Sequence, residues 1–184
     1  MDLQQLQKNF RANKKIKFVF FWGHKTKSDE VTNSCFSQWY PASFIVDDVR
    51  YSSAEHYMMA EKARIFNDIE IRERIIQTSN PGTAKALGRE VKGFDQAIWE
   101  QQRMEIVIRA NEAKFSQNRD LAEFLISTGS RILVEASPVD KIWGIGLSKQ
   151  DKEAENPLLW RGLNLLGFAL MKVRSTLIEK TLNR

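Results

Sequence analysis

Cysteine and histidine are scarce in this sequence of 184 residues, which contains one cysteine, Cys35, and two histidines. A lone cysteine cannot form a disulfide within the chain, and so few histidines and cysteines do not supply a set of zinc ligands at short spacing. The composition therefore predicts a protein of a reducing compartment, the cytoplasm, without a zinc site. We expect it to use no metal and no other cofactor.

Long apolar runs are also lacking. No stretch of the sequence approaches the roughly 20 consecutive apolar residues that a membrane-spanning helix requires. The basic residues of segment 1–16 are not followed by the apolar stretch of a secretory signal. We therefore expect a soluble protein without a membrane partner, and we expect it to be a monomer.

The apolar content and the charge fit one globular domain with a basic surface. Hydrophobic residues make up 42% of the chain, enough for one substantial core at this length. The 28 lysines and arginines exceed the 23 acidic residues, so the formal net charge is +5. A basic balance favours polyanionic or phosphorylated ligands, although dispersed lysines and arginines equally fit an ordinary solvated surface.

Hydrophobic periodicity separates short β-rich runs from longer helical segments. Runs of β-branched and aromatic residues predict strands at 17–22 and 131–135 and a hairpin over 44–51 that turns at its two aspartates. Caps and apolar spacing predict helices that begin at Ser52, Asp68, Asn80, Asp95, Asp120 and Asn156. The pattern indicates an α+β fold, a helix-rich single domain with a small β-sheet over 17–184, preceded by a basic leader over 1–16.

The helical segment after Ser52 places ionisable side chains among apolar ones. Glu55 and Lys62 are seven residues apart, so at about 100° per residue they point to nearly the same side of a helix. The two methionines between them offer an apolar wall that would shift the pKa of either group toward a useful value. The structural alternative is a capping box, in which the glutamate only bonds the Ser52 amide and the lysine is solvated.

Five tryptophans form a second signal, because flat aromatic faces suit nucleobases. Trp22, Trp99 and Trp143 are the candidates for substrate binding, whereas ordinary burial is the preferred interpretation of Trp160. Trp143 belongs to the loop 137–146 (SPVDKIWGIG), which combines a carboxylate, an aromatic ring and glycines whose backbone can approach a ligand closely. A purely structural turn is the alternative for this loop.

Five segments, taken in order, resemble the NADAR (YbiA-like) family. They are 36–41 (FSQWYP), 54–57 (AEHY) with Ala60 and Lys62, 84–88 (AKALG), 135–140 (EASPVD) and 143–146 (WGIG). Any one of them is unremarkable, but five in this order over about 18–177 make chance similarity improbable. The resemblance implies a mainly helical fold with a small sheet and an N-glycosidase activity on ribosylated bases.

The resemblance also implies roles for individual residues. The glutamate of the family's EHY motif falls on Glu55, the lysine two turns later on Lys62, and the acid of its SPxD motif on Asp140. The pocket tryptophan of the family corresponds to Trp99, and Gly144 lies in the loop that follows the acid. These residues are therefore expected to form the catalytic and substrate-binding site.

One segment departs from the family pattern. The family carries an SNFYP-like stretch, whereas this chain has SQWYP at 37–41. Gln38 keeps the amide of the usual asparagine but moves it by one methylene, and Tyr40 keeps the aromatic position. We expect both residues to contact substrate, with a changed contact at Gln38 and a correspondingly different substrate choice.

Two substrate classes and two chemical routes stay open at this point. The resemblance implies either a small phosphoribosylated aminopyrimidine of riboflavin synthesis or an ADP-ribosylated guanine in nucleic acid. In one route water attacks the ribose directly and Lys62 acts through its charge; in the other Lys62 forms a Schiff base with the opened sugar. The alternative from another class is a non-catalytic ADP-ribose or nucleic-acid binding module.

Overall fold

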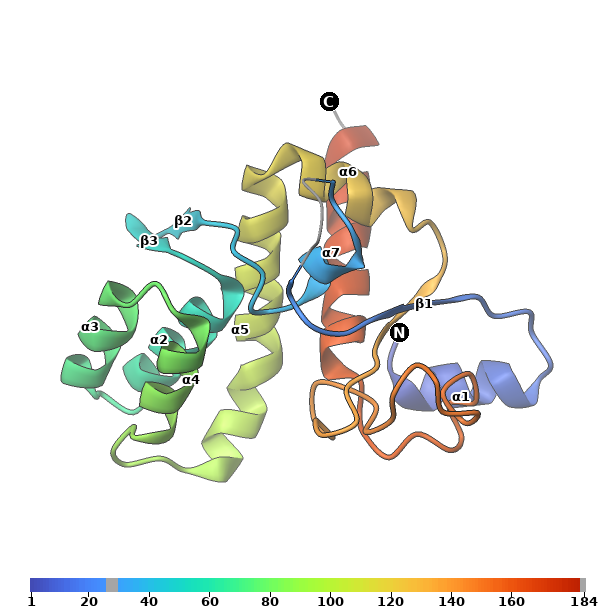
Figure 1. Ribbon diagram of the computed structural model, residues 1–184, viewed down its shortest axis with the longest axis horizontal. Coiled ribbons are helices and arrows are strands. Elements are labelled where there is room, and N and C mark those ends of the chain that lie inside the picture. The colour runs from blue at the N-terminus through green and yellow to red at the C-terminus, as the bar shows by residue number, and fades with distance from the viewer. Residues whose placement is uncertain (26–29, 183–184) are drawn as a thin grey trace. The chain divides into compact units, whose positions relative to one another are not determined.

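The computed structural model describes residues 1–25 and 30–182, and it divides into two compact units (Figure 1). The first unit combines Met1–Ser37 with Asp120–Arg184, and the second is the continuous segment Gln38–Arg119. In the described part of the chain, no helix has the length and apolar content needed to cross a membrane.

The continuous unit is a helical cluster that carries a β-hairpin. Its elements are β2 (Phe44–Val46), β3 (Val49–Tyr51), α2 (Ala54–Ile65), α3 (Ile69–Gln77), α4 (Pro81–Arg89) and α5 (Gln96–Gln117). Helix α2 packs against α3, α4 and α5, so it lies at the centre of this unit. The arrangement buries nearly every side of α2, which explains why its sequence shows little amphipathic periodicity.

The predicted start of each later helix in this unit is confirmed. The Asp68 and Asp95 side chains accept hydrogen bonds from the backbone amides of Ile71 and Ile98, at 3.2 and 2.9 Å. Asn80 caps α4 in the same way, and proline occupies the first helical position after it. These caps satisfy amides that the first helical turn leaves without a partner, so local chemistry sets these boundaries.

The hairpin also forms where the sequence predicts it. Val46 and Val49 are paired at the turn, and the two aspartates between them both have positive φ, 50° for Asp47 and 61° for Asp48. Two such residues make the tight turn whose twist matches that of antiparallel strands. Arg109 of α5 donates to both carboxylate oxygens of Asp47 at 2.8 Å, which holds the turn against the long helix.

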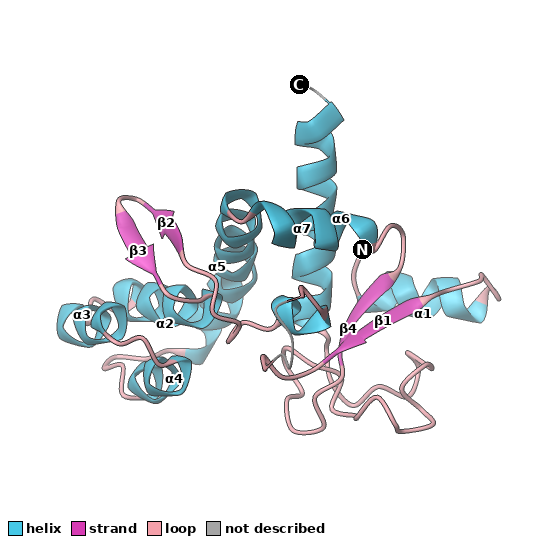
Figure 2. Cartoon of the chain, turned by 45° about the horizontal axis from the view of Figure 1, so that its top comes forward, coloured by secondary structure: helices cyan, strands magenta, loops and turns pink. Residues whose placement is uncertain are grey.

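The discontinuous unit is built from both ends of the chain. Its elements are α1 (Leu3–Arg11), β1 (Phe18–Phe21), the 3-10 helix η1 (Asn33–Phe36), α6 (Arg119–Ser127), β4 (Ile132–Glu135) and α7 (Leu165–Leu182). Strands β1 and β4 are parallel and pair from Phe18 with Ile132 to Phe21 with Glu135 (Figure 2). Helix α7 packs on β4.

The structure has two small sheets where the sequence analysis predicts one. The strand at 18–21 and the hairpin form two separate two-stranded sheets, and the first of these takes its partner from 132–135. Periodicity identifies strands but not their partners, and a parallel pair needs a long connection between its strands. The helix-rich α+β class itself is confirmed.

The last helix, α7, begins at Leu165 and not at Asn156, so the predicted start is wrong. The Asn156 side chain accepts a hydrogen bond from the Leu158 amide in a turn, at 3.0 Å, and the chain then runs back along the loop 141–146. There the amides of Leu163 and Asn164 donate to the carbonyls of Lys141 and Gly144. These tertiary bonds compete successfully with a helix that the leucine spacing alone favours.

The leader 1–16 contains an ordered helix. Asp2 caps α1 through the Gln5 amide at 2.8 Å, and Leu6 is fully buried. The Gln7 side chain donates to the Pro157 carbonyl at 3.0 Å, which ties the helix to the same unit. The division into a leader and a domain from residue 17 stays a prediction.

Asn164 completes the edge of β4 that faces away from β1. Its side-chain oxygen accepts from the Glu135 amide at 3.0 Å, and its side-chain nitrogen donates to the Leu133 carbonyl at 2.9 Å. Asn164 is fully buried and adopts a positive φ of 53°. One residue thus takes the place of a third strand, because the backbone groups of a buried strand edge must be satisfied.

Replacement of Asn164 tests this role. We expect Asn164→Ala to lower the free energy of unfolding by about 2–4 kcal/mol, because it removes two hydrogen bonds and puts alanine, which tolerates left-handed backbone less well than asparagine does, at this position. Asn164→Gly tolerates the backbone conformation but still lacks the bonds, so it should stay less stable than wild type. Urea unfolding monitored by circular dichroism measures both, and full recovery of stability by the glycine variant would contradict the bonding role.

Candidate functional site

The centre of the continuous unit carries polar side chains on a buried helix. Glu55, His56 and Glu61 of α2 are 3%, 1% and 6% exposed. Burial of ionisable groups is costly unless partners compensate, and such groups concentrate at functional sites. The burial of Glu61 has a structural explanation, because its carboxylate accepts two hydrogen bonds from Arg64 Nε at 3.0 and 2.9 Å.

The start of α2 excludes the predicted capping box. The N-cap is Ser53 and not Ser52, so Glu55 is the second helical residue and the box would need it to be the third. The Ser53 hydroxyl is instead hydrogen-bonded to His56 Nδ1 at 2.7 Å, and burial lowers the pKa of His56. The Glu55 backbone amide donates to the Gln38 carbonyl at 3.0 Å. The predicted box between Ser52 and Glu55 is therefore not the arrangement at the start of α2.

Lys62 extends into a corner made by aromatic rings and a helix end. Its amine donates to the Gly88 carbonyl at 2.7 Å and lies 4.2 Å from the ring centre of Phe94 and 6.0 Å from that of Trp99. Burial lowers the pKa of the Lys62 amine, and the nearby Arg89 cation lowers it further. Both effects raise the fraction of neutral amine, the form that acts as a nucleophile.

Gly88 permits this geometry by bringing α4 close to α2. A Cβ at this position would collide with the Met59 side chain, with Met59 Cγ only 2.9 Å away. The helix runs through Gly88 to Arg89, so this glycine does not end it. Close packing here places a backbone carbonyl within reach of the Lys62 amine.

Trp99 is the predicted pocket residue that lies beside Lys62. It is 8% exposed and occupies the first turn of α5 behind the Asp95 cap. The Trp99 ring and the Phe94 ring face the same amine, so the corner is aromatic as the sequence suggested. A role for Trp99 in substrate stacking stays a prediction.

Gln38 and Tyr40 lie in the same unit and contact the protein interior. Gln38 is 6% exposed, and its side-chain oxygen accepts from Asn111 Nδ2 at 2.8 Å. Lys114 Nζ lies 5.5 Å from the centre of the Tyr40 ring. The Gln38 amide thus joins the start of the unit to α5, and contact of either residue with substrate stays a prediction.

Several site-shaping residues escaped the sequence interpretation. Gly88 and Phe94 complete the Lys62 corner, and Asn111 and Lys114 bring polar atoms into the interior, both at 0% exposure. Asn111 and Lys114 follow Val107 at helical spacing on an otherwise apolar face of α5. Two polar residues on such a face indicate buried polar groups, so the sequence pattern could have identified them. Nothing local in the sequence shows that Gly88 and Phe94 approach Lys62.

Asp140 in the discontinuous unit shapes its own loop. One carboxylate oxygen accepts from the backbone amides of Ile142 and Trp143 at 2.8 and 2.7 Å. The Asp140 carbonyl also accepts from the Gly146 amide at 3.1 Å. These bonds define the course of the loop that presents Trp143, which is half-buried.

Gly144 is buried where the same loop crosses the end of β4. A Cβ at Gly144 would lie 2.8 Å from the Glu135 carbonyl oxygen and 3.0 Å from that of Asp140. Its own carbonyl accepts from the Asn164 amide at 3.0 Å. Close packing of backbone on backbone thus requires glycine here, and contact of Gly144 with a ligand stays a prediction.

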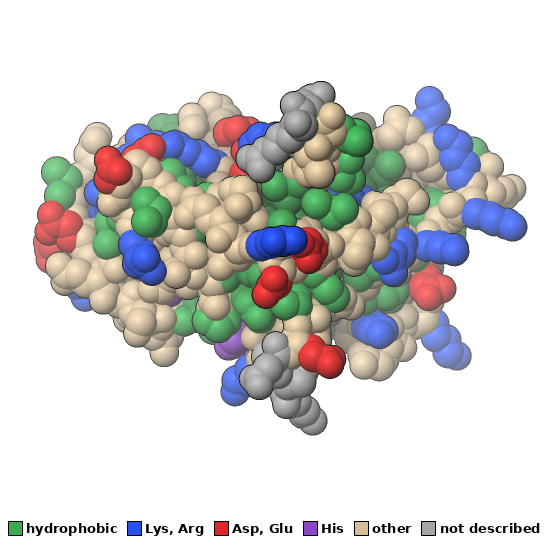
Figure 3. Space-filling view, turned by 90° about the horizontal axis from the view of Figure 1, so that it is seen from above, with side chains coloured by type: hydrophobic (Ala, Val, Ile, Leu, Met, Phe, Trp, Pro, Cys, Tyr) green, Lys and Arg blue, Asp and Glu red, His purple; other side chains and the backbone are tan. Residues whose placement is uncertain are grey.

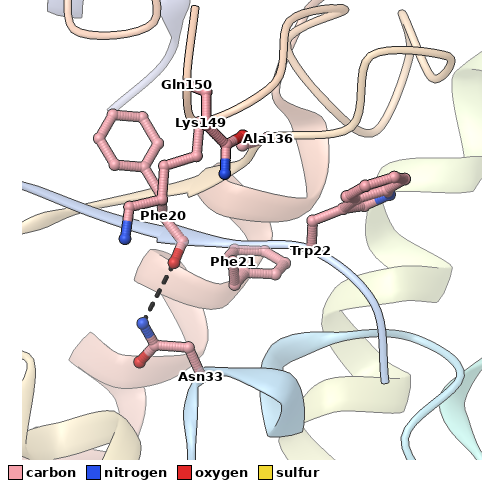
Figure 4. A pocket seen from close by; sticks show the side chains of 7 residues that line it. All are labelled: Phe20, Phe21, Trp22, Asn33, Ala136, Lys149 and Gln150. Carbon is pink, nitrogen blue, oxygen red and sulfur yellow. Dashed lines mark hydrogen bonds between the residues drawn. The ribbon is translucent and has the colours of Figure 1, made fainter. Parts of the chain in front are cut away.

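A cavity of about 240 Å³ opens at the carboxyl ends of β1 and β4 (Figure 4). Its lining residues are Phe20, Phe21, Trp22, Asn33, Ala136, Lys149 and Gln150. Lys149 and Gln150 lie on one side of the strand and Asn33 on the other, where Asn33 Nδ2 donates to the Phe20 carbonyl at 3.1 Å. Trp22 is 62% exposed, so its face is available to a flat ligand.

The predicted site residues divide between the two units. Gln38, Tyr40, Glu55, Lys62 and Trp99 belong to the continuous unit, and Trp22, Asp140, Trp143 and Gly144 belong to the other. Within the first group the structure brings Lys62 and Trp99 together, and within the second it joins Asp140 to Trp143. Lys149, Gln150 and Asn33 were not predicted, because only the fold carries them to the strand ends.

Known proteins resemble this chain over most of its length. An N-glycosidase of Acanthamoeba polyphaga mimivirus is 43% identical over 163 residues, which cover 86% of this chain and 95% of that protein. N-glycosidase YbiA of Escherichia coli is 32% identical over 158 residues, covering 85% and 88%. A riboflavin biosynthesis protein of Vibrio vulnificus is 32% identical over 143 residues, covering 78% of this chain and 35% of that protein.

The fold shows the same relationship. The NMR structure of the E. coli protein YbiA superposes with a TM-score of 0.71 at 27% identity, covering 93% of this chain and 90% of that one. The predicted YbiA-like fold is thereby confirmed. The NADAR domain model matches residues 20–178. The chain therefore belongs to the NADAR family, among its YbiA-like N-glycosidases.

Proposed function

We propose that this chain hydrolyses the bond between C1 of a phosphorylated ribose and a nitrogen of a base, with Glu55 and Lys62 at the reaction centre. The observation that carries the proposal is the Lys62 amine, held at 2.7 Å from the Gly88 carbonyl in an aromatic corner, with its pKa lowered by burial. Glu55 lies two turns earlier on the same continuous helix. The names of the related N-glycosidases support this reaction.

The chemistry requires negative charge near C1 and assistance for the departing nitrogen. An N-glycosidic bond breaks through an oxocarbenium-like state, which a carboxylate stabilises and from which the base leaves with a proton. Glu55 supplies the carboxylate and directs water or a proton at the ribose. Its burial strengthens this interaction, because the surroundings screen charge less than water does.

Lys62 acts by one of two routes. In the direct route its charge stabilises the reacting sugar while water adds to C1. In the covalent route the neutral amine adds to C1 as the C1–N bond to the base breaks, the sugar ring opens to an imine, and water then releases the ribose and restores the amine. The lowered pKa of Lys62 favours the covalent route.

The remaining predicted residues bind and orient. Trp99 or Trp143 stacks on the base, and Trp22 offers a further aromatic face. Asp140 orients ribose through the loop that it shapes, and Arg89 supplies a cation beside Lys62 for phosphate. The substrate is a phosphoribosylated aminopyrimidine or an ADP-ribosylated guanine. The riboflavin biosynthesis relative supports the first class. The single cysteine supports a cytoplasmic site of action.

The carboxylate role of Glu55 predicts a loss of turnover in Glu55→Gln. We expect kcat to fall by roughly 100-fold or more, because an amide neither carries charge nor moves protons, whereas ligand affinity should change little. Release of free base from each substrate class, followed by mass spectrometry, measures turnover, and calorimetry measures binding. Glu73→Gln, at an exposed glutamate of α3, is the matched control and should keep full activity. Full activity of Glu55→Gln would refute the assignment.

The covalent route predicts a trapped adduct at Lys62. Reduction of the working enzyme with sodium borohydride should add the mass of the reduced sugar to the peptide that contains Lys62, since borohydride converts an imine into a stable amine. Lys62→Arg keeps the charge but cannot form the adduct and should lose turnover, while Lys85→Arg on α4 should retain both adduct and turnover. Turnover retained by Lys62→Arg without an adduct would establish the direct route instead.

Arg89 should tune the pH dependence. Because its charge lowers the pKa of Lys62, Arg89→Gln should raise that pKa and shift the ascending limb of the rate profile to higher pH. The limb ascends because the neutral amine exists above its pKa. Lys85→Gln, which removes a cation from the same helix, is the control. A limb that does not move in Arg89→Gln would show that Lys62 does not titrate in the reaction.

A further inference from the structure

The first 17 residues hold most of the net positive charge of the chain. They contain five cations against one carboxylate, a net charge of +4 out of the total of +5. The cations are Lys8, Arg11, Lys14, Lys15 and Lys17, and all five are exposed. The sequence interpretation of dispersed charge therefore misses a local excess, which Figure 3 shows as basic side chains gathered over the α1 end of the discontinuous unit.

This basic surface is held in place on its unit. Leu6 is fully buried, Gln7 bonds the Pro157 carbonyl, and the Lys17 carbonyl accepts from the Ile132 amide at 2.8 Å beside the first pair of the parallel sheet. Between these anchors, Lys14 Nζ donates to the Asn9 side chain at 3.0 Å. A ligand would meet cations on a fixed surface and would not have to order a free tail.

A cavity adjoins Lys14, Lys15 and Lys17. It measures about 370 Å³, and its lining residues are Met1, Leu6, Asn9, Lys14, Lys15, Ile16, Lys17, Ser130 and Ile132. Three lysines thus line a cavity that also has apolar side chains and is large enough for a nucleotide-sized group. The family match begins at residue 20, and seven of the nine lining residues lie before it, all but Ser130 and Ile132. This surface is therefore mostly a separate feature of the chain.

We propose that residues 8–17 and this cavity form a binding surface for the phosphate backbone of nucleic acid. Clustered lysines and arginines contact phosphates without regard to sequence, and the cavity beside them accepts a sugar or base. An anionic membrane fits less well, because the apolar residues of α1 that would insert are already turned toward the protein: Leu6 is fully buried, and Leu3 and Phe10 are half-buried. This binding does not depend on the proposed N-glycosidase activity. If both proposals are correct, the substrate is a ribosylated base within a polynucleotide.

The test compares two triple variants of equal charge. Lys14→Gln, Lys15→Gln and Lys17→Gln together remove the lysines of the cavity, while Lys152→Gln, Lys172→Gln and Lys180→Gln remove exposed lysines elsewhere in the same unit. Binding to a fluorescent 20-nucleotide DNA, single- and double-stranded, is measured by anisotropy over a range of salt. The first triple should lose roughly 10-fold or more in affinity and about three units of salt slope, and the second should lose much less.

Each other outcome overturns the proposal. Equal losses in the two triples would show a general charge effect, and absence of wild-type binding, or binding to anionic phospholipid vesicles but not to DNA, would exclude a nucleic-acid surface. Circular dichroism confirms that both triples are folded. Turnover of a free ribosylated base by the first triple should equal that of wild type, so a failure of binding and a failure of the proposed activity are read separately.

Discussion

The burial of α2 is the constraint on which the proposed reaction centre depends. Three helices surround α2, and the close approach of α4 that Gly88 allows brings a carbonyl to the Lys62 amine. A helix in this position would ordinarily be apolar on every side. The chain instead accepts buried polar groups there and satisfies several of them, with Ser53 bonded to His56 and Arg64 to Glu61. Burial of these polar groups costs free energy, and a catalytic role of α2 would account for that cost.

In the discontinuous unit, the two parallel strands are stabilised by contacts with a side chain, a helix and a loop. Asn164 bonds the free edge of β4, α7 packs on β4, and the loop 137–146 folds over the strand end through bonds to Asp140. The carboxyl ends of parallel strands are where open sheets commonly present ligands. Here that end carries Trp22, an exposed aromatic face, beside a cavity with a lysine and two amides.

The two units carry different kinds of group. The continuous unit supplies the ionisable pair and Arg89, which is proposed to assist with phosphate, whereas the discontinuous unit supplies aromatic faces and backbone-rich loops suited to holding a ligand. The basic surface on α1 adds a third element outside the matched family domain. The proposed chemistry, the proposed ligand positioning and the proposed nucleic-acid contact thus use separate parts of one chain.

Features that depend on near neighbours can be predicted from the sequence alone. The Asp68, Asn80 and Asp95 caps, the hairpin at Asp47 and Asp48, and the placement of Glu55 and Lys62 on one helix follow from spacing and local bonding, and ordered motifs identified the family. The tertiary structure alone decided which strand pairs with β1, where α7 begins, and that Phe94 and Gly88 enclose Lys62. These contacts join residues distant in sequence, and no local periodicity encodes the partner of a buried group.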